Sequence, residues 1–203
     1  MGQEGLASHK KKGRVTGAHI VFIDESGFLM LPTVHRTWSP KGQTPVLLHR
    51  TRSHKKVSVI GALSISPIRR RIRLFLAWHV NANVRQDEVI QFLRDLLRHL
   101  RGNVIVIWDR LNAHRSHKTK SFVENQKRLT IEFLPPYAPE MNPVEGVWGY
   151  LKYHRLPNHG IYDVDELHHR ASEEADDVAA TPELLRSFVA ASGLPIRIPS
   201  SVH

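Results

Sequence analysis

Residues 104–109 read Val-Ile-Val-Ile-Trp-Asp, a continuous apolar run that ends in a carboxylate. Four consecutive β-branched residues followed by Trp are typical of a central strand buried on both faces of a sheet. A second, mostly apolar run, residues 18–23, is also followed by an aspartate, Asp24. Because ligands gather at strand ends in sheets of this kind, the two runs predict that Asp24 and Asp109 are neighbours.

The first part of the chain predicts an antiparallel meander. We expect the strand that ends near Asp24 to turn at Ser26-Gly27 and to return through residues 28–31. Strands over residues 57–63 and 72–76 should then pair across a turn near Pro67.

The period of the apolar residues changes after Gln86. Between Gln86 and Leu100 they recur at helical spacing, and Gly102 stands in the usual place for a left-handed cap. The remaining pattern predicts a helix over 117–127, a strand over 130–134, and helices from Asn142, over 163–179 and over 182–191. This order predicts an α/β fold with a mixed central sheet flanked by helices. A Rossmann fold is disfavoured, because no glycine-rich nucleotide motif is present.

Composition narrows the class of protein. The chain has 203 residues, of which 41% are hydrophobic and 24% charged, as in an ordinary globular protein with one sizeable core. It has no cysteine, which excludes disulfides, thiolate zinc sites and a cysteine nucleophile and is compatible with a reducing cytoplasm. We expect no membrane partner, because no apolar run approaches the roughly 20 residues that span a bilayer.

The positive charge is concentrated in the first part of the chain. Residues 1–75 hold 14 Lys and Arg against 3 Asp and Glu, while the whole chain has a net charge of +10. Such asymmetry favours a surface for nucleic acid over a basic face that is merely solvated. The expected phosphate contacts are Lys10, Lys11, Lys12, Arg14, Lys41, Arg69, Arg70 and Arg71.

Three carboxylates are the candidate catalytic residues, and each has a structural alternative. Asp24 precedes Ser-Gly and could be a turn residue, and Asp109 could be the N-cap of the segment that follows it. Glu145 follows Asn142-Pro143 at the start of a helix, where it could complete a capping box. Glu25 alternates to the other side of its strand and is the weaker ligand. The candidate active-site neighbours are Asn112, His114 and Asn142.

Together the three carboxylates suggest a metal site that acts on phosphodiesters. Mg²⁺ prefers oxygen ligands and takes one or two carboxylates plus substrate phosphates and water, and Mn²⁺ could substitute for it. Two such ions about 3.5–4 Å apart can activate an attacking oxygen and stabilise a leaving one. We therefore predict that Asp24, Asp109 and Glu145 are at once the catalytic residues and the metal ligands.

Three segments carry a resemblance to a known family: FIDESGF (22–28), VIWDRLNAHRS (106–116) and LPPYAPEMNPVEGVWGYLK (134–152). They resemble the DDE catalytic domain of bacterial insertion-sequence transposases of the mariner superfamily. The likeness runs from about residue 18 to 180 and includes the stretch WSPKGQTP (38–45). It implies an RNase H-like fold, with three antiparallel and then two parallel strands, and the triad Asp24, Asp109 and Glu145. The 35 residues between the last two match the close spacing of that superfamily.

The resemblance implies hydrolytic cleavage at transposon ends and then attack of the freed 3′-hydroxyl on target DNA. Its partners would be DNA, a second copy of the chain, and a helix-turn-helix protein from an upstream reading frame, because family members usually carry such a region and none is evident here. We expect a basic arm (1–14), a catalytic domain (15–180) and a C-terminal helix and tail (181–203), in a bacterial cytoplasm near the nucleoid. The alternatives are a non-catalytic DNA-binding or regulatory remnant, another RNase H-like nuclease and, least favoured, a small-molecule hydrolase.

Overall fold

One five-stranded sheet forms the centre of the molecule. The structure, a computed structural model, describes residues 17–30, 41–42, 55–68, 71–109, 114, 116–157 and 161–196. The strands are β1 (His19–Leu29), β2 (Lys56–Ile65), β3 (Ile72–Val80), β4 (Val104–Trp108) and β5 (Leu129–Phe133), in the order β3-β2-β1-β4-β5. The first three pair antiparallel, and β4 and β5 run parallel to β1. The predicted mixed sheet is confirmed.

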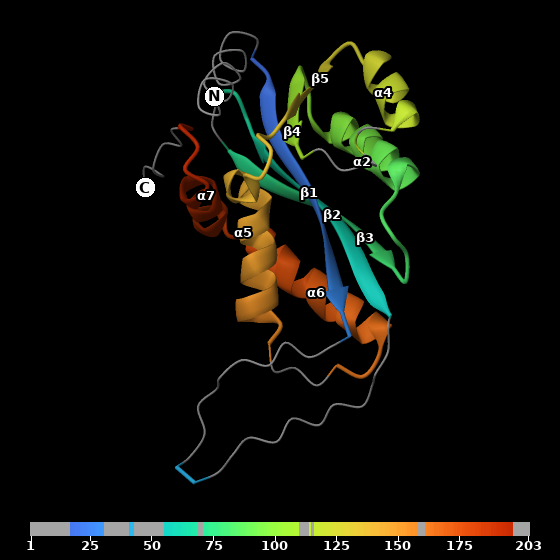
Figure 1. Cartoon of the computed structure of the whole chain (residues 1–203). Helices are drawn as coiled ribbons and strands as arrows, with labels where there is room; N and C mark the ends of the chain where they lie inside the picture. The colour runs from blue at the N-terminus through green and yellow to red at the C-terminus, as the bar shows by residue number, and fades with distance from the viewer. Residues whose placement is uncertain are drawn as a thin grey trace.

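Helices cover both faces of the sheet (Figure 1). One face carries α2 (Gln86–His99) and α4 (His117–Glu124), and the other carries the later helices. These are α5 (Pro143–Tyr150), which follows a 3₁₀ turn, η1 (Pro139–Met141), and continues into a π-helical turn, η2 (Leu151–Arg155), then α6 (Val164–Ala179) and α7 (Pro182–Ala191). The predicted helices over 163–179 and 182–191 are therefore confirmed, and Asp163 is the N-cap of α6.

Alternation along β1 divides the core into two halves. Ile20 and Phe22 belong to the half beneath α5, α6 and α7, whereas Val21 and Ile23 belong to the half beneath α2 and α4. Side chains two residues apart on a strand share a face. The side chain of Asp24 therefore points to the face of the sheet that α5 covers, and the side chain of Glu25 points to the face that α2 covers.

The predicted turn at Ser26-Gly27 is wrong. β1 continues without interruption to Leu29, and Gly27 pairs with Ser58 in the ladder with β2. The pairing of β1 with the long neighbouring strand outweighs the local preference of Ser-Gly for a turn. Asp24 thus lies within a strand, opposite Gly61, and not at a strand end.

The end of α2 also differs from the prediction. Gly102 has the expected positive φ of 88°, but α2 has already ended at His99. The guanidinium of Arg128, just before β5, donates to the carbonyl oxygens of Leu97, Leu100 and Gly102. A cation at this position satisfies helix carbonyls that have no partner within the helix and complements the helix dipole. A residue 28 positions along the chain from Leu100 therefore caps α2.

Close packing of α5 on the sheet depends on a glycine. A Cβ atom at Gly61 would lie 2.5 Å from Cη2 and 2.6 Å from Cζ2 of the buried Trp148 ring. The bare backbone of β2 is thus the surface on which this indole lies. At Gly149 on α5, in contrast, a Cβ atom would meet nothing within 4 Å.

We expect Gly61→Ala to lower the free energy of unfolding by about 1–3 kcal/mol, because the added methyl group would displace Trp148 from the sheet. Gly149→Ala is the matched control. It should stabilise the protein by up to about 1 kcal/mol, because alanine favours the helix and finds open space there. Urea unfolding of both variants tests the pair, and equal stabilities would contradict the packing described.

Candidate active site

Asp24 is a buried carboxylate with one strong hydrogen bond. Its exposed fraction is 8%, and Nε1 of Trp148 on α5 donates to its Oδ2 at 2.9 Å. Trp148 itself is 2% exposed. Because the indole lies on Gly61, the residue paired with Asp24 in β2, strand pairing and helix packing place the donor and the acceptor together.

Asn142 fixes the start of α5 beside the same strand. Its Oδ1 accepts from the Val144 N–H at 3.2 Å, as an N-cap does, while its Nδ2 donates to the Ile23 carbonyl at 3.0 Å. Asn142 is only 3% exposed, so both bonds are buried. The side chain predicted to neighbour the active site therefore caps the helix and also links it to β1, next to Asp24.

Glu145 lies exposed in the first turn of α5. In a capping box its side chain would accept the backbone N–H of Asn142, but that N–H donates to Pro139 O at 2.8 Å. The capping alternative thus loses its donor. Glu145 faces Asp24 closely enough to raise the pKa of that group.

The pKa of Asp24 is raised to about 8. Burial is the largest cause, followed by repulsion from Glu145 and Glu25, and Asp109 adds a smaller repulsion. The hydrogen bond from Trp148 acts in the opposite direction. Carboxylates from β1, from the end of β4 and from α5 thus act on one buried group.

Asp109 is held by a buried histidine. His114 Nδ1 lies 2.9 Å from Asp109 Oδ1, and its Nε2 lies 2.7 Å from Glu25 Oε1. The ring stacks on Trp108 with centroids 4.1 Å apart and planes at 1°. Burial lowers the pKa of His114, but the hydrogen bonds to Asp109 and Glu25 raise it by more, to about 9. His114 is therefore an imidazolium at neutral pH that bridges two carboxylates.

Two residues that contact the candidate site, Glu25 and Lys152, were not predicted to do so from the sequence. Glu25 does project to the other face, as predicted, but there it is the partner of His114, 89 residues away, and no local pattern signals that contact. Lys152 is half-buried beside the carboxylates and donates to Ser26 Oγ at 2.7 Å. Burial lowers the pKa of Lys152, while Glu145 and Asp24 raise it. Its place two helical turns after Glu145 was the available signal.

The side chains at this site suit a hard divalent cation, because they are carboxylates that surround Asp24. The negative charge of ionised Asp24 is strongly disfavoured without such a cation. In the part of the chain that the structure describes, however, no three His, Asp or Glu residues are arranged to hold one metal ion. One oxygen of each aspartate already has a partner, since Trp148 donates to Oδ2 of Asp24 and His114 lies against Oδ1 of Asp109.

The structure describes only some of the residues that are predicted to contact phosphate. Lys41 and Arg71 are exposed, as a DNA contact requires. Outside the described residues lie Asn112, Arg69 and Arg70 and the basic-arm residues Lys10, Lys11, Lys12 and Arg14. Among the described residues no helix is long and apolar enough to cross a membrane.

Solved structures of Mos1 transposase are similar in fold to this chain. The chain matches the Mos1 strand transfer complex at 19% identity and a TM-score of 0.59, covering 95% of this chain and 59% of that one. A pre-cleavage Mos1 transpososome matches at 17% identity and a TM-score of 0.61, with 95% and 60% covered. The Mos1 transposase catalytic domain bound to raltegravir and Mn matches at 15% identity and a TM-score of 0.52, with 96% and 92% covered. At these identities the likeness establishes the RNase H-like fold.

A curated relative adds a shorter match. The uncharacterized protein y4pE/y4sA of Sinorhizobium fredii (strain NBRC 101917 / NGR234) is 34% identical over 66 residues, which cover 32% of this chain and 46% of the relative. The chain thus spans less than half of that relative and about three fifths of the Mos1 chains in the two assemblies. The model of the DDE superfamily endonucleases matches residues 19–168, about three quarters of the sequence and the whole region that carries the three carboxylates. The chain belongs to the DDE superfamily endonuclease family.

Proposed function

We propose that this chain is a transposase catalytic domain that cleaves and joins DNA strands with Mg²⁺. The observation that carries the proposal is the electrostatic convergence of Asp109 and Glu145 on the buried Asp24, in a member of the DDE family. The Mos1 assemblies, named as strand-transfer and paired-end complexes, support DNA and a second copy of the chain as partners. Mos1 complexes with Mg and with Mn support Mg²⁺, with Mn²⁺ as a substitute.

Asp24, Asp109 and Glu145 would hold the metal. When bound, divalent cations activate the attacking oxygen and stabilise the leaving oxygen of a phosphodiester. The attacking oxygen belongs to water in end cleavage and to the freed 3′-hydroxyl in strand transfer. Trp148 leaves Oδ1 of Asp24 as the oxygen without an indole donor, and His114 orients Asp109. The Lys152 ammonium adds positive charge beside Glu145 and Asp24.

Recognition of the transposon ends requires contacts with base edges. Contacts between cations and phosphates supply affinity without reading bases. We therefore propose that a helix-turn-helix protein from a separate reading frame supplies end recognition.

A second candidate is a non-catalytic DNA-binding protein. It is favoured by one observation, the absence of an assembled metal-holding group among the described residues. Such a protein would bind DNA and show no metal-dependent cleavage, so the nicking assay below separates the two functions.

With Mg²⁺ or Mn²⁺ the chain should nick supercoiled plasmid DNA, and Asp109→Ala or Glu145→Gln should slow nicking more than about a hundredfold. Metal stabilisation of the transition state contributes several kcal/mol, and each 1.36 kcal/mol is tenfold in rate. Glu140→Gln, an exposed carboxylate in the preceding turn, is the control and should nick at the wild-type rate. Wild-type rates in Asp109→Ala and Glu145→Gln would remove the triad from the mechanism.

In the metal-free protein, the free energy of unfolding should fall as the pH rises from about 4 to about 9. Asp24 keeps its proton up to a pKa of about 8 in the folded state, against 3.8 when unperturbed, so the unfolded state gains between those values. His114 has the same sign, because its stabilising charge is complete below 6.5 and lost as the pH passes about 9. Asp24→Asn should flatten the lower part of the profile and His114→Gln the upper part. Urea unfolding in EDTA measures this, and an unchanged profile in both variants would refute it.

Trp148→Phe should weaken Mn²⁺ binding by about 10–100-fold at neutral pH, the usual cost of losing a partner that orients a metal ligand. The indole N–H lowers the pKa of Asp24, so its loss makes the required deprotonation harder, and the deficit should shrink above pH 8. Trp108→Phe is the matched control, because it keeps an aromatic ring to stack on His114, and the buried Nε1 that it removes has no hydrogen-bond partner among the described residues. Melting temperature against Mn²⁺ concentration gives the affinities, and equal values for the two variants would contradict the role of Trp148.

A further inference from the structure

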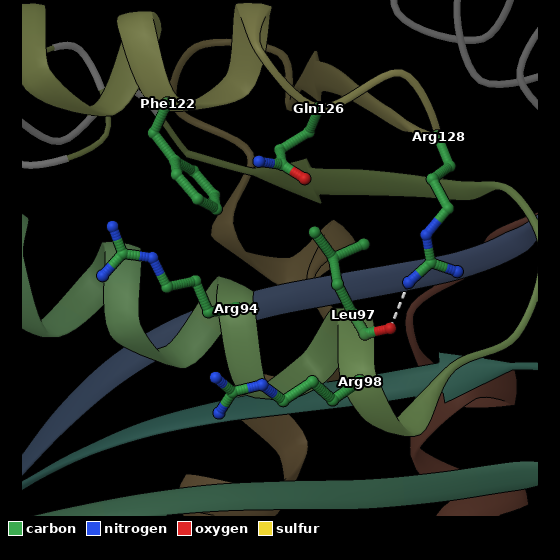
Figure 2. Close-up of a pocket in the computed structure, with 6 residues that line it drawn as sticks. All are labelled: Arg94, Leu97, Arg98, Phe122, Gln126 and Arg128. Carbon is green, nitrogen blue, oxygen red and sulfur yellow. Dashed lines mark hydrogen bonds between the residues drawn. The ribbon is translucent and has the colours of Figure 1, made fainter.

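An open hollow of about 320 Å³ lies between α2 and α4, on the face of the sheet opposite α5. It is lined by Arg94, Leu97, Arg98, Phe122, Gln126 and Arg128. Figure 2 shows the α2 side chains on one side of the hollow, with Phe122 and Gln126 reaching toward them from the other. The lining carries three guanidinium groups and no carboxylate, so its charge suits an anion.

Arg128 places a fixed positive charge at one side of the hollow. Its guanidinium is bonded to carbonyl oxygens at the end of α2, and Figure 2 draws the bond to Leu97. Those bonds hold the guanidinium in place while its charge still acts across the hollow. Arg128 is therefore a fixed charge and not the primary contact for a ligand.

Arg94 and Arg98 are the groups that a ligand can engage. They are one helical turn apart on α2, so they present two cations along one line. The Arg94 guanidinium lies 5.4 Å from the centroid of the Phe122 ring, a cation–π contact that orients it, and it has no hydrogen-bond acceptor among the described residues. Arg98 pairs with Asp95 at 2.8 Å, but both side chains are exposed, and such a pair contributes little.

We propose that this hollow binds phosphodiester groups of DNA at a place separate from the cleaved bond. Arginine is the side chain best suited to phosphate oxygens, since its planar group can donate two parallel hydrogen bonds. The amide of Gln126 adds a further donor beside them. The inference rests on the proposed function for the identity of the polyanion, and it adds a contact surface on the second face of the sheet.

The test compares two pairs of charge reversals in the full-length chain, with a short fluorescent DNA duplex as the probe and EDTA present to prevent cleavage. Arg94→Glu with Arg98→Glu should weaken binding by about an order of magnitude. It should also make the salt slope shallower by about two units, because each lost phosphate contact removes about 0.9. Arg101→Glu with Lys127→Glu is the matched control. It makes the same charge change at exposed positions near the ends of the same helices, outside the hollow. The control should weaken binding less than about threefold.

Equal losses in the two pairs, or no loss in either, would overturn the site, because the basic face would then act diffusely or not at all. Inorganic phosphate is the second probe. If it raises the melting temperature of the wild type but not of the Arg94/Arg98 pair, and DNA affinity is unchanged, the hollow takes small anions and the DNA assignment is wrong. Arg94→Gln with Arg98→Gln repeats the test if the reversed pair does not fold, as judged by circular dichroism.

Plasmid nicking separates this inference from the proposed function. The variant with Arg94→Glu and Arg98→Glu should still nick plasmid when DNA is saturating. Only the DNA concentration needed for half-maximal nicking should rise. If the wild-type chain does not nick DNA, but the variant with Arg94→Glu and Arg98→Glu still binds DNA more weakly than the wild type, DNA binding at the hollow is supported and the transposase proposal is wrong.

Discussion

The contact of Trp148 with Gly61 is the constraint on which the candidate site depends. Only a residue without a Cβ atom lets the indole lie on β2, and this position brings Nε1 to Asp24 in the neighbouring strand. Asn142 makes the second link, from the cap of α5 to the backbone of β1. Two buried bonds thus fix a helix relative to a strand 119–124 residues away in sequence, and Glu145, which lies between them on α5, takes its position from both.

Charge balance follows from this packing. Four carboxylates, those of Asp24, Glu25, Asp109 and Glu145, act on one another across the end of β4 and the start of α5, against two cations, His114 and Lys152. With Asp24 deprotonated these six groups carry two negative charges in excess. The raised pKa of Asp24 shows how strongly the fold disfavours that state. In the proposed function one divalent cation neutralises the two excess negative charges. Without the cation, the protonated form of Asp24 has the lower free energy.

Local patterns predicted what depends on local structure. The apolar period gave α7 the bounds found in the structure, and α2 its first residue. The predicted turn at Ser26-Gly27 failed because a ladder with β2, formed about 30 residues later, decides that backbone. The end of α2 failed for the same reason, since its cap is Arg128. The carboxylates Asp24, Asp109 and Glu145 could be named from their strands, helix and family likeness, whereas the bridge from Glu25 to His114 has no sequence signature.

The alternation of β1 explains why the two aspartates of the proposed triad are positioned independently. Asp24 projects to the α5 side, where Trp148 holds it, and Glu25 projects to the α2 side, where it holds His114. Asp109, just beyond β4, joins the α2 side through that histidine and its stacking partner Trp108. The sheet therefore separates the groups that orient Asp24 from those that orient Asp109. Asp109 is the member of the proposed triad that links the catalytic face to the face carrying the arginine-lined hollow.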